Sequence, residues 1–249
     1  SYDEELGCLG VRSLLRAVGQ ADLEASGAII GEPTEMQAAL AHKGKIAFRV
    51  VCRGIAAHSA NPSKGVNAIS VAAGMVTELD RLQAYIKENE RHDVRFEVPF
   101  STVQVGLIEG GTALNIVPEE CVLTSEIRLL PAVDGAGYLE WLEDAASRLV
   151  DVFPGSRVMI EVVNAYPGLN GDPESEIAAF VMNRMRQNEP GVVGFGTEAG
   201  LFSEMLDMPS VICGPGSISR AHKADEFITV GELEDGARFL FGVLESLVI

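Results

Sequence analysis

The chain has 249 residues, of which 47% are hydrophobic and 22% are charged, and its formal net charge is −17. This hydrophobic content can fill the cores of one large or two modest domains, and it argues against intrinsic disorder. The negative charge repels phosphate backbones and anionic lipid headgroups, which argues against nucleic acid and membrane surfaces as partners.

The first part of the chain predicts a helix followed by a short strand. Apolar residues recur with helical spacing over residues 9–18. The segment "SGAIIGEPT" then indicates a buried strand that stops at Gly31 and is followed by Glu32 and Pro33. A proline at this point favours an extended backbone for the residue before it.

The middle of the chain predicts a ferredoxin-like sandwich. The order strand–helix–strand–strand–helix–strand over roughly residues 45–164 is typical of that fold. The predicted elements are a strand at 45–54, a helix at 65–86, a strand at 101–111 that ends in a Gly-Gly turn, a strand at 120–130 stopped by Pro131, a helix at 135–153 and a strand at 156–166.

After Pro167 the alternation of helices and short apolar strands resumes. The last helix begins with a capping-box pattern, Thr229 with Glu232 three residues later. The remaining predicted elements are a helix at 175–187, a strand, glycine turn and helix at 191–202, and a strand running into a glycine-rich loop at 208–217. We therefore expect a discontinuous α/β domain, a sheet flanked by helices, formed by residues 1–40 and 165–249, with a smaller domain inserted at 41–164.

The four cysteines are far apart in the sequence and form no C-x-x-C pair. This spacing predicts reduced, buried thiols, as is usual in the cytoplasm, rather than a disulfide framework or a cysteine zinc site. His42, one step before "KGK", is expected to make a local hydrogen bond at the hinge between the domains.

Unusual polar residues follow several predicted strands. Glu32 and His222 come after apolar strands, as do Thr197 and Glu198, whereas Asp3, Glu4 and Glu5 precede a helix. In open α/β sheets ligands bind at the edge formed by the carboxyl ends of the strands, so these groups could meet in one crevice.

Carboxylate and imidazole ligands suit zinc, and zinc lowers the pKa of bound water to about 7. Adjacent carboxylates on an extended backbone point in different directions, so one can hold metal while the other faces substrate. Taken singly, however, a glutamate after a strand is more often a helix cap or a surface group, and a lone histidine is more often structural.

Six sequence blocks, occurring in one order, carry a resemblance to a known family. They are "DEELGCLG", "GEPT", "GIAAHSANPSKGVNAI", "GGTALNIVPEECVLTSEIR", "GTEAGLF" and "CGPGSISRAHKADEFI". Together they resemble the metallohydrolases that include acetylornithine deacetylase, succinyl-diaminopimelate desuccinylase, aminoacylase and carboxypeptidase G2. The resemblance covers essentially the whole chain and implies a catalytic α/β domain with an inserted ferredoxin-like lid through which homodimers form.

The resemblance also implies roles for individual residues. Glu4 would be the general base, Glu5 a metal ligand, Glu32 a ligand of the other metal and His222 a further ligand. His58 would reach the active site of a neighbouring subunit and stabilise the oxyanion. Arg128, Asn115 and Thr197 match substrate-binding positions, although Arg128 could instead form an ordinary ion pair with Glu126. Two zinc ions are implied, with cobalt as an alternative metal.

The family pattern has two further ligands upstream, a His in an H-x-D block and an Asp that bridges the metals, and neither occurs here. We therefore expect these residues to work with a missing N-terminal segment of the same protein, and the 249-residue chain alone to bind metal poorly and hydrolyse nothing.

The amino-acid sequences of the blocks favour deacetylation of N-acetylornithine, a step of arginine biosynthesis, with metal-activated water as the nucleophile. The alternatives are desuccinylation of N-succinyl-diaminopimelate, or another aminoacylase or carboxypeptidase reaction of the family. From another class, the chain could be a non-catalytic dimerisation or binding module that lacks the metal centre.

Overall fold

The computed structural model describes residues 1–21 and 25–247. They form two compact units. The terminal unit contains Ser1–Gly44, Arg95–Glu97 and Tyr166–Ile249, and the inserted unit contains Lys45–Val94 and Val98–Ala165. The main boundaries between the units thus lie at 44/45 and 165/166. The predicted boundaries were 40/41 and 164/165. The catalytic and lid roles of the two parts stay predictions.

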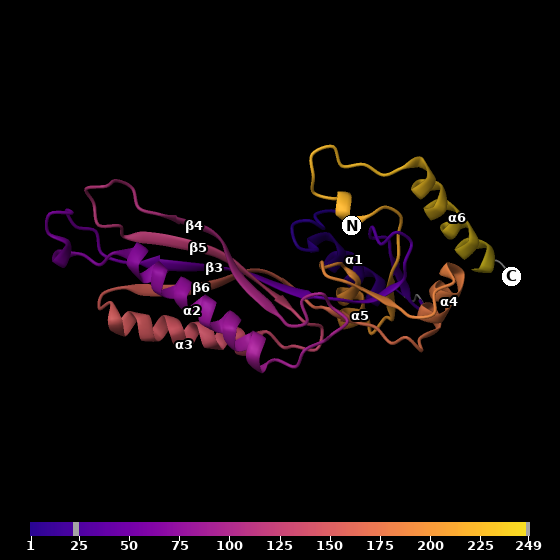
Figure 1. Cartoon of the computed structure of the whole chain (residues 1–249), viewed down its shortest axis with the longest axis horizontal. Coiled ribbons are helices and arrows are strands. Elements are labelled where there is room, and N and C mark those ends of the chain that lie inside the picture. The colour runs from indigo at the N-terminus through magenta and orange to yellow at the C-terminus, as the bar shows by residue number, and fades with distance from the viewer. Residues whose placement is uncertain (22–24, 248–249) are drawn as a thin grey trace. The chain divides into compact units, whose positions relative to one another are not determined.

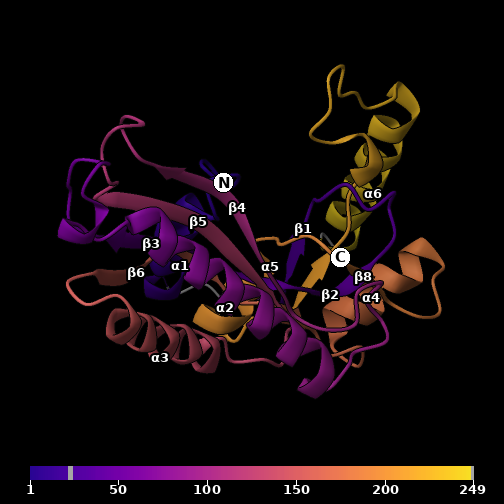
Figure 2. The same ribbon diagram turned by 60° about the vertical axis from the view of Figure 1, so that its left-hand side comes forward.

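The inserted unit has the ferredoxin-like fold. Its elements, in chain order, are β3 (Gly44–Arg53), α2 (Ala68–Asn89), β4 (Thr102–Gly110), β5 (Glu120–Leu129), α3 (Ala136–Val152) and β6 (Arg157–Tyr166), with a short 3₁₀ helix η1 (Pro62–Lys64) before α2. The strands lie in the order β4-β5-β3-β6. Figures 1 and 2 show α2 and α3 side by side along this sheet.

Local sequence explains where these elements begin and end. The side chain of Asn67 accepts hydrogen bonds from the amides of Ile69 and Ser70, which caps the start of α2. Gly111 has a φ of 80°, so the predicted Gly-Gly turn after β4 is formed with the left-handed backbone that glycine allows. The core between the helices and the sheet is apolar and includes Phe48, Met75, Leu79, Leu123, Ile127 and Leu142.

The terminal unit is built around a small mixed sheet. Its helices are α1 (Leu9–Gln20), α4 (Glu176–Met185), α5 (Ala199–Leu206) and α6 (Val230–Leu247), with a 3₁₀ helix η2 (Ile218–Arg220). Its strands are β1 (Ala28–Ile30), β2 (Ala39–His42), β7 (Leu169–Asn170), β8 (Gly191–Val193) and β9 (Ser210–Ile212). β1 and β9 are parallel, as are β2 and β8, but β2 runs antiparallel to β9 and β7.

Two apolar clusters cover the sheet of the terminal unit. One joins Leu40 and Val211 of the sheet to Val181 of α4 and Phe239 of α6. Another joins Ala39, Leu169 and Ile212 of the sheet to Ala199 of α5. A third cluster packs α1 against α5 through Val11, Leu15 and Leu201. The predicted class, a helix-flanked α/β sheet with an inserted α+β domain, is therefore confirmed.

Several local predictions are confirmed as well. Thr229 and Glu232 form the capping box: each backbone amide donates to the other residue's side chain, at 2.8 and 3.2 Å. Hydrogen bonds from the amide and the hydroxyl of Thr229 to the Glu232 carboxylate, and then the Arg220 guanidinium, lower the pKa of Glu232 to about 2. All four cysteines are free and buried.

Within the described part of the chain, no helix has the length and apolar character needed to cross a bilayer.

Candidate metal-binding site

The acidic segment at residues 3–5 forms turns, not the extended backbone that we expected. The amides of Gly7 and Cys8 both donate to the carbonyl oxygen of Glu4 at 2.8 Å, and Asp3 and Cys8 have positive φ angles. The two carboxylates nevertheless differ in environment, because Glu4 is partly buried and Glu5 is exposed. Burial and the Glu5 carboxylate raise the pKa of Glu4, and the Cys8 thiol, 3.6 Å from Oε1 of Glu4, opposes this rise.

Glu32 lies at the point where two parallel strands leave the sheet. β1 ends at Ile30, which is in register with Ile212 at the end of β9. Beyond the strands, the amide and the hydroxyl of Thr34 hydrogen-bond with the backbone of Gly214. This contact confirms that the segment carrying Glu32 and the segment leading to His222 leave the sheet at one edge.

The carboxyl of Glu32 belongs to a group of like charges. Burial and then the carboxylates of Glu4, Glu198 and Glu5, in decreasing order of effect, together raise its pKa to about 7. Carboxylates held close enough to oppose each other's ionisation are stabilised by a bound cation. The chemistry of this donor set therefore fits a metal.

His222 reaches the same group from the opposite end of the sequence. Its backbone is left-handed, with a φ of 57°, and its amide donates to Oε2 of Glu226 at 3.0 Å. Its Nε2 lies 3.6 Å from Oε1 of Glu5, and the two side chains are 68% and 74% exposed. Two ligand atoms on one tetrahedral zinc ion lie about 3.3–3.6 Å apart, so the pair has the separation that a shared zinc ion requires.

Glu32 does not complete a three-ligand site with this pair. Within residues 1–21 and 25–247, no three His, Cys, Asp or Glu side chains are close enough together to hold a metal by themselves. The assignment of Glu5 and Glu32 to different metal ions stays a prediction.

Thr197 and Glu198 form the turn that begins α5. β8 is parallel to β2 and hence antiparallel to β9, so this turn does not leave the sheet with Glu32, contrary to our expectation from the parallel-strand rule. Glu198 is nevertheless close enough to raise the pKa of Glu4 and Glu32. Sequence reasoning placed it in the crevice but gave it no role. Its position directly after Thr197, a predicted substrate-binding residue, could have indicated a role for Glu198.

Thr197 is fully buried, and its hydroxyl accepts a hydrogen bond from the Ala199 amide at 3.0 Å. The side chain therefore caps α5. A contact between Thr197 and substrate stays a prediction.

In the inserted unit, His58 and Asn115 lie on two neighbouring loops. Residues 58 and 116 form an isolated antiparallel bridge, and the amide of Ser59 donates to the carbonyl oxygen of Asn115 at 3.0 Å. The exposed imidazole of His58 accepts at Nδ1 from the Ala60 amide at 3.0 Å. Two residues predicted to reach one substrate site are thus neighbours.

Arg128 lies near the opposite end of β5 from Asn115. Its guanidinium donates twice to the Glu126 carboxylate, at 3.0 and 3.3 Å, and Lys45 lies 3.4 Å from the same carboxylate. The ion pair weighed as the alternative for Arg128 is present. Substrate binding by Arg128 stays a prediction.

Known proteins resemble this chain in sequence and in fold. The model of the M20 peptidase dimerisation domain matches residues 40–151. Acetylornithine deacetylase of Myxococcus xanthus is 35% identical over 232 residues, which are 93% of this chain and 59% of that protein. Acetylornithine deacetylase of Yersinia pseudotuberculosis is 32% identical over 242 residues, which are 97% of this chain and 60% of that protein.

The chain thus contains the dimerisation domain of M20 peptidases. It spans about three fifths of the length of these curated relatives. Solved structures show the same M20 fold. A tripeptidase from Staphylococcus aureus matches with a TM-score of 0.70 at 19% identity, over 92% of this chain and 60% of that one. Aminopeptidase PepT from Bacillus cereus matches with a TM-score of 0.69 at 20% identity, over 96% and 63%.

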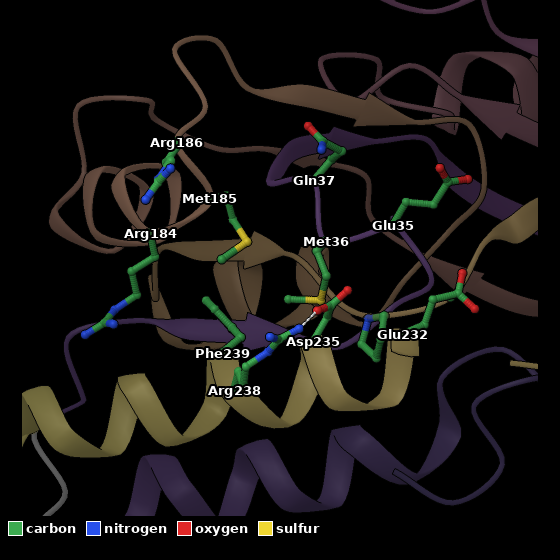
Figure 3. A pocket seen from close by; sticks show the side chains of 12 residues that line it. Glu35, Met36, Gln37, Arg184, Met185, Arg186, Glu232, Asp235, Arg238 and Phe239 are labelled. Carbon is green, nitrogen blue, oxygen red and sulfur yellow. Dashed lines mark hydrogen bonds and ion pairs between the residues drawn. The ribbon is translucent and has the colours of Figure 1, made fainter. Parts of the chain in front are cut away.

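A separate pocket of about 600 Å³ also lies in the terminal unit (Figure 3). Its lining comes from the end of α4, from α6 and from residues 35–37, and includes the ion pair between Arg238 and Asp235. The residues that line it include none of the predicted ligands or the general base. This pocket is therefore not where the family's chemistry is expected.

Proposed function

We propose that this protein is a metal-dependent amidohydrolase that removes the acyl group from an N-acyl amino acid. The observation that carries the proposal is the approach of His222 to Glu5 within 3.6 Å, beside the carboxyls of Glu4 and Glu32. An exposed pair of this kind contributes little to stability, so shared metal ligation accounts for it better than folding does.

Each residue of the group has a role in this proposal. Glu5 and His222 would hold one zinc ion and Glu32 the other, with cobalt as an alternative metal. The further His and Asp of the family pattern do not occur in this sequence and would have to come from elsewhere in the protein. Zinc supplies Lewis acidity that brings the pKa of a bound water near neutrality. Glu4 would accept a proton from the attacking water and return it to the departing amine. Its raised pKa brings the carboxyl closer to the value that this exchange needs.

The favoured substrate is N-acetylornithine, because the curated relatives that match over nearly the whole chain are named acetylornithine deacetylases. Arg128, Asn115 and Thr197 bind the carboxylate or amide of the substrate in this proposal. The nearest alternative is N-succinyl-diaminopimelate.

The inserted unit forms the dimer, and its match to a peptidase dimerisation domain supports this step. His58 then acts in the active site of the partner subunit, where its imidazole stabilises the oxyanion. In this proposal the adjacent loop, which carries Asn115, reaches the same active site as His58.

The test uses the full-length gene product. Amine release is measured from N-acetylornithine, N-succinyl-diaminopimelate and neutral N-acetyl amino acids, before and after chelation and after readdition of zinc or cobalt. We expect N-acetylornithine to be hydrolysed fastest, with about two metal ions per chain. A full-length protein that binds no metal and hydrolyses none of these amides would instead favour the non-catalytic module.

A further inference from the structure

His42 is a buried histidine that the proposed chemistry does not use. It is the last residue of β2, and its side chain is fully buried. Its Nδ1 lies 2.9 Å from the carbonyl oxygen of Lys43, and its Nε2 lies 3.1 Å from the amide nitrogen of Gly200. The first contact is the local hydrogen bond that the sequence predicts, and the second is a long-range contact that it does not.

These two partners define the protonation state of the ring. A carbonyl oxygen can only accept, so Nδ1 carries the proton, and a backbone amide can only donate, so Nε2 is the acceptor. His42 is therefore a neutral imidazole in one tautomer. Burial, the larger effect, lowers its pKa to about 4, which favours this neutral form.

The Gly200 amide belongs to the first turn of α5. The first amides of a helix have no partner within the helix and need acceptors from elsewhere. Here the Ala199 amide is bonded by the Thr197 hydroxyl and the Gly200 amide by His42. Two side chains, one local and one from the central strand β2, thus fix the start of α5.

Close backbone packing holds the same turn from another side. A Cβ atom on Gly200 would lie 2.5 Å from the carbonyl oxygen of Pro167, and one on Gly196 would lie 2.1 Å from the hydroxyl of Tyr166. Only glycine permits these approaches. The turn is therefore enclosed between His42 and residues 166–168.

Glu198 is carried by this turn. It is largely buried, and it lies close enough to Glu4 and Glu32 to raise the pKa of both. A shift of the turn would therefore move a charge that acts directly on the predicted general base.

We propose that His42 is a positioning residue, whose neutral imidazole holds the first turn of α5, and Glu198 with it, beside the carboxyls of Glu4 and Glu32. The consequence for turnover rests on the proposed amidohydrolase function, whereas the positioning itself does not.

The test compares three variants of the full-length protein. His42→Leu removes the acceptor and keeps an apolar side chain in the space. His42→Gln keeps an acceptor oxygen that can reach the Gly200 amide. Val181→Ala, in the buried face of α4, is the control, because it weakens the same unit through an apolar cluster that contains no residue of α5.

Two measurements on the metal-free protein test the positioning alone. Imidazole ¹⁵N shifts of the wild type near pH 7 should show a proton on Nδ1 and a hydrogen-bonded Nε2. In His42→Leu the amides of Ala199 and Gly200 should exchange with solvent at least roughly tenfold faster, because their opening no longer breaks this bond. His42→Gln should restore slow exchange, and Val181→Ala should keep it.

Kinetics test the consequence. His42→Leu should lower kcat by at least roughly tenfold, with a smaller effect on KM, because small displacements of catalytic groups are costly. His42→Gln should recover most of kcat, and Val181→Ala should retain it at a matched loss of Tm.

A ring protonated on Nε2 or charged at pH 7, or a folded His42→Leu protein with unchanged exchange at Gly200, overturns the positioning role. A kcat for His42→Leu equal to that of Val181→Ala overturns its consequence. If His42→Leu does not fold, the ¹⁵N shifts of the wild type and the exchange in His42→Gln decide. If the wild type hydrolyses no amide, the proposed function fails, and the ¹⁵N and exchange results still decide the role of His42.

Discussion

Nε2 of His222 lies 3.6 Å from Oε1 of Glu5, which joins a loop near the end of the chain to a turn near its beginning. Both side chains are mostly exposed, so neither burial nor packing explains why they meet. Solvent-exposed ion pairs contribute about 0–1 kcal/mol to stability. In the proposed function this contact, between two metal-binding side-chain types, belongs to a zinc ligand set.

Replacing Glu5 should therefore separate metal binding from stability. We expect Glu5→Gln to weaken zinc binding by at least roughly tenfold, because a ligand is lost, and to leave Tm of the metal-free protein almost unchanged. Metal titration and thermal unfolding of the full-length protein check both points. Glu204→Gln, an exposed carboxylate on α5, is the matched control and should change neither value. Equal zinc affinity in the two variants would remove Glu5 from the ligand set.

Glu32 should behave differently, because it is one of several carboxylates that oppose each other. Its pKa is raised from 4.5 to about 7, so the folded state takes up a proton more readily than the unfolded chain. In the metal-free protein this group stabilises the fold below about pH 4.5, and that contribution is lost as the pH rises to about 7.

Glu32→Gln removes the carboxylate whose ionisation is unfavourable in the folded state. We therefore expect a higher Tm at pH 8 for the metal-free variant than for the metal-free wild type. The same change removes a metal ligand, so zinc binding should weaken. Thermal unfolding with and without zinc measures both effects. A variant with a lower metal-free Tm would show that the Glu32 carboxylate is stabilised by contacts that the cluster of acids does not explain.

Much of the fold follows from local patterns in the sequence. The alternation of β3 to β6 and the apolar periodicity of α2 and α3 predict the inserted unit almost residue by residue. β2 and β7 were not predicted. β2 is the four-residue segment "ALAH", buried along its whole length, so it has no polar–apolar alternation, and β7 has only two residues.

The part of the site that depends on where strands end could be predicted from the sequence. Parallel strands β1 and β9 bring the Glu32 segment next to the segment that leads to His222, as expected. The bond from His42 to Gly200 could not be foreseen, because it joins a strand to a helix far away in the sequence. The distance between Nε2 of His42 and the amide of Gly200 depends on tertiary packing, which no local sequence pattern encodes.

Subunit mixing tests whether His58 acts in the partner's site. Glu4→Gln and His58→Ala should each inactivate the homodimer. In a mixed dimer one active site would combine an intact Glu4 with an intact His58 from the partner, so random exchange should restore about a quarter of the wild-type rate. Mixing Glu4→Gln with Glu5→Gln is the control and should restore nothing, because both residues belong to one subunit's site. No recovery in the first mixture would place the action of His58 within its own subunit, or outside the reaction.

His42 should make stability depend on pH in a defined window. Its pKa falls from 6.5 to about 4 on folding, so between these values the unfolded chain binds a proton that the folded state does not. Stability from this group is therefore fully present above about pH 6.5 and decreases as the pH falls to about 4. The shift corresponds to roughly 3 kcal/mol.

Glu32 contributes with the opposite sign in an overlapping range, so wild-type data alone would mix the two effects. Urea unfolding of the metal-free wild type and of His42→Gln isolates the histidine, because Glu32 and the neighbouring Lys43 are present in both proteins. The difference in unfolding free energy, wild type minus variant, should decrease by roughly 3 kcal/mol between pH 7 and pH 4. A difference that stays constant across this range would mean that His42 titrates normally and is not held neutral between Lys43 and Gly200.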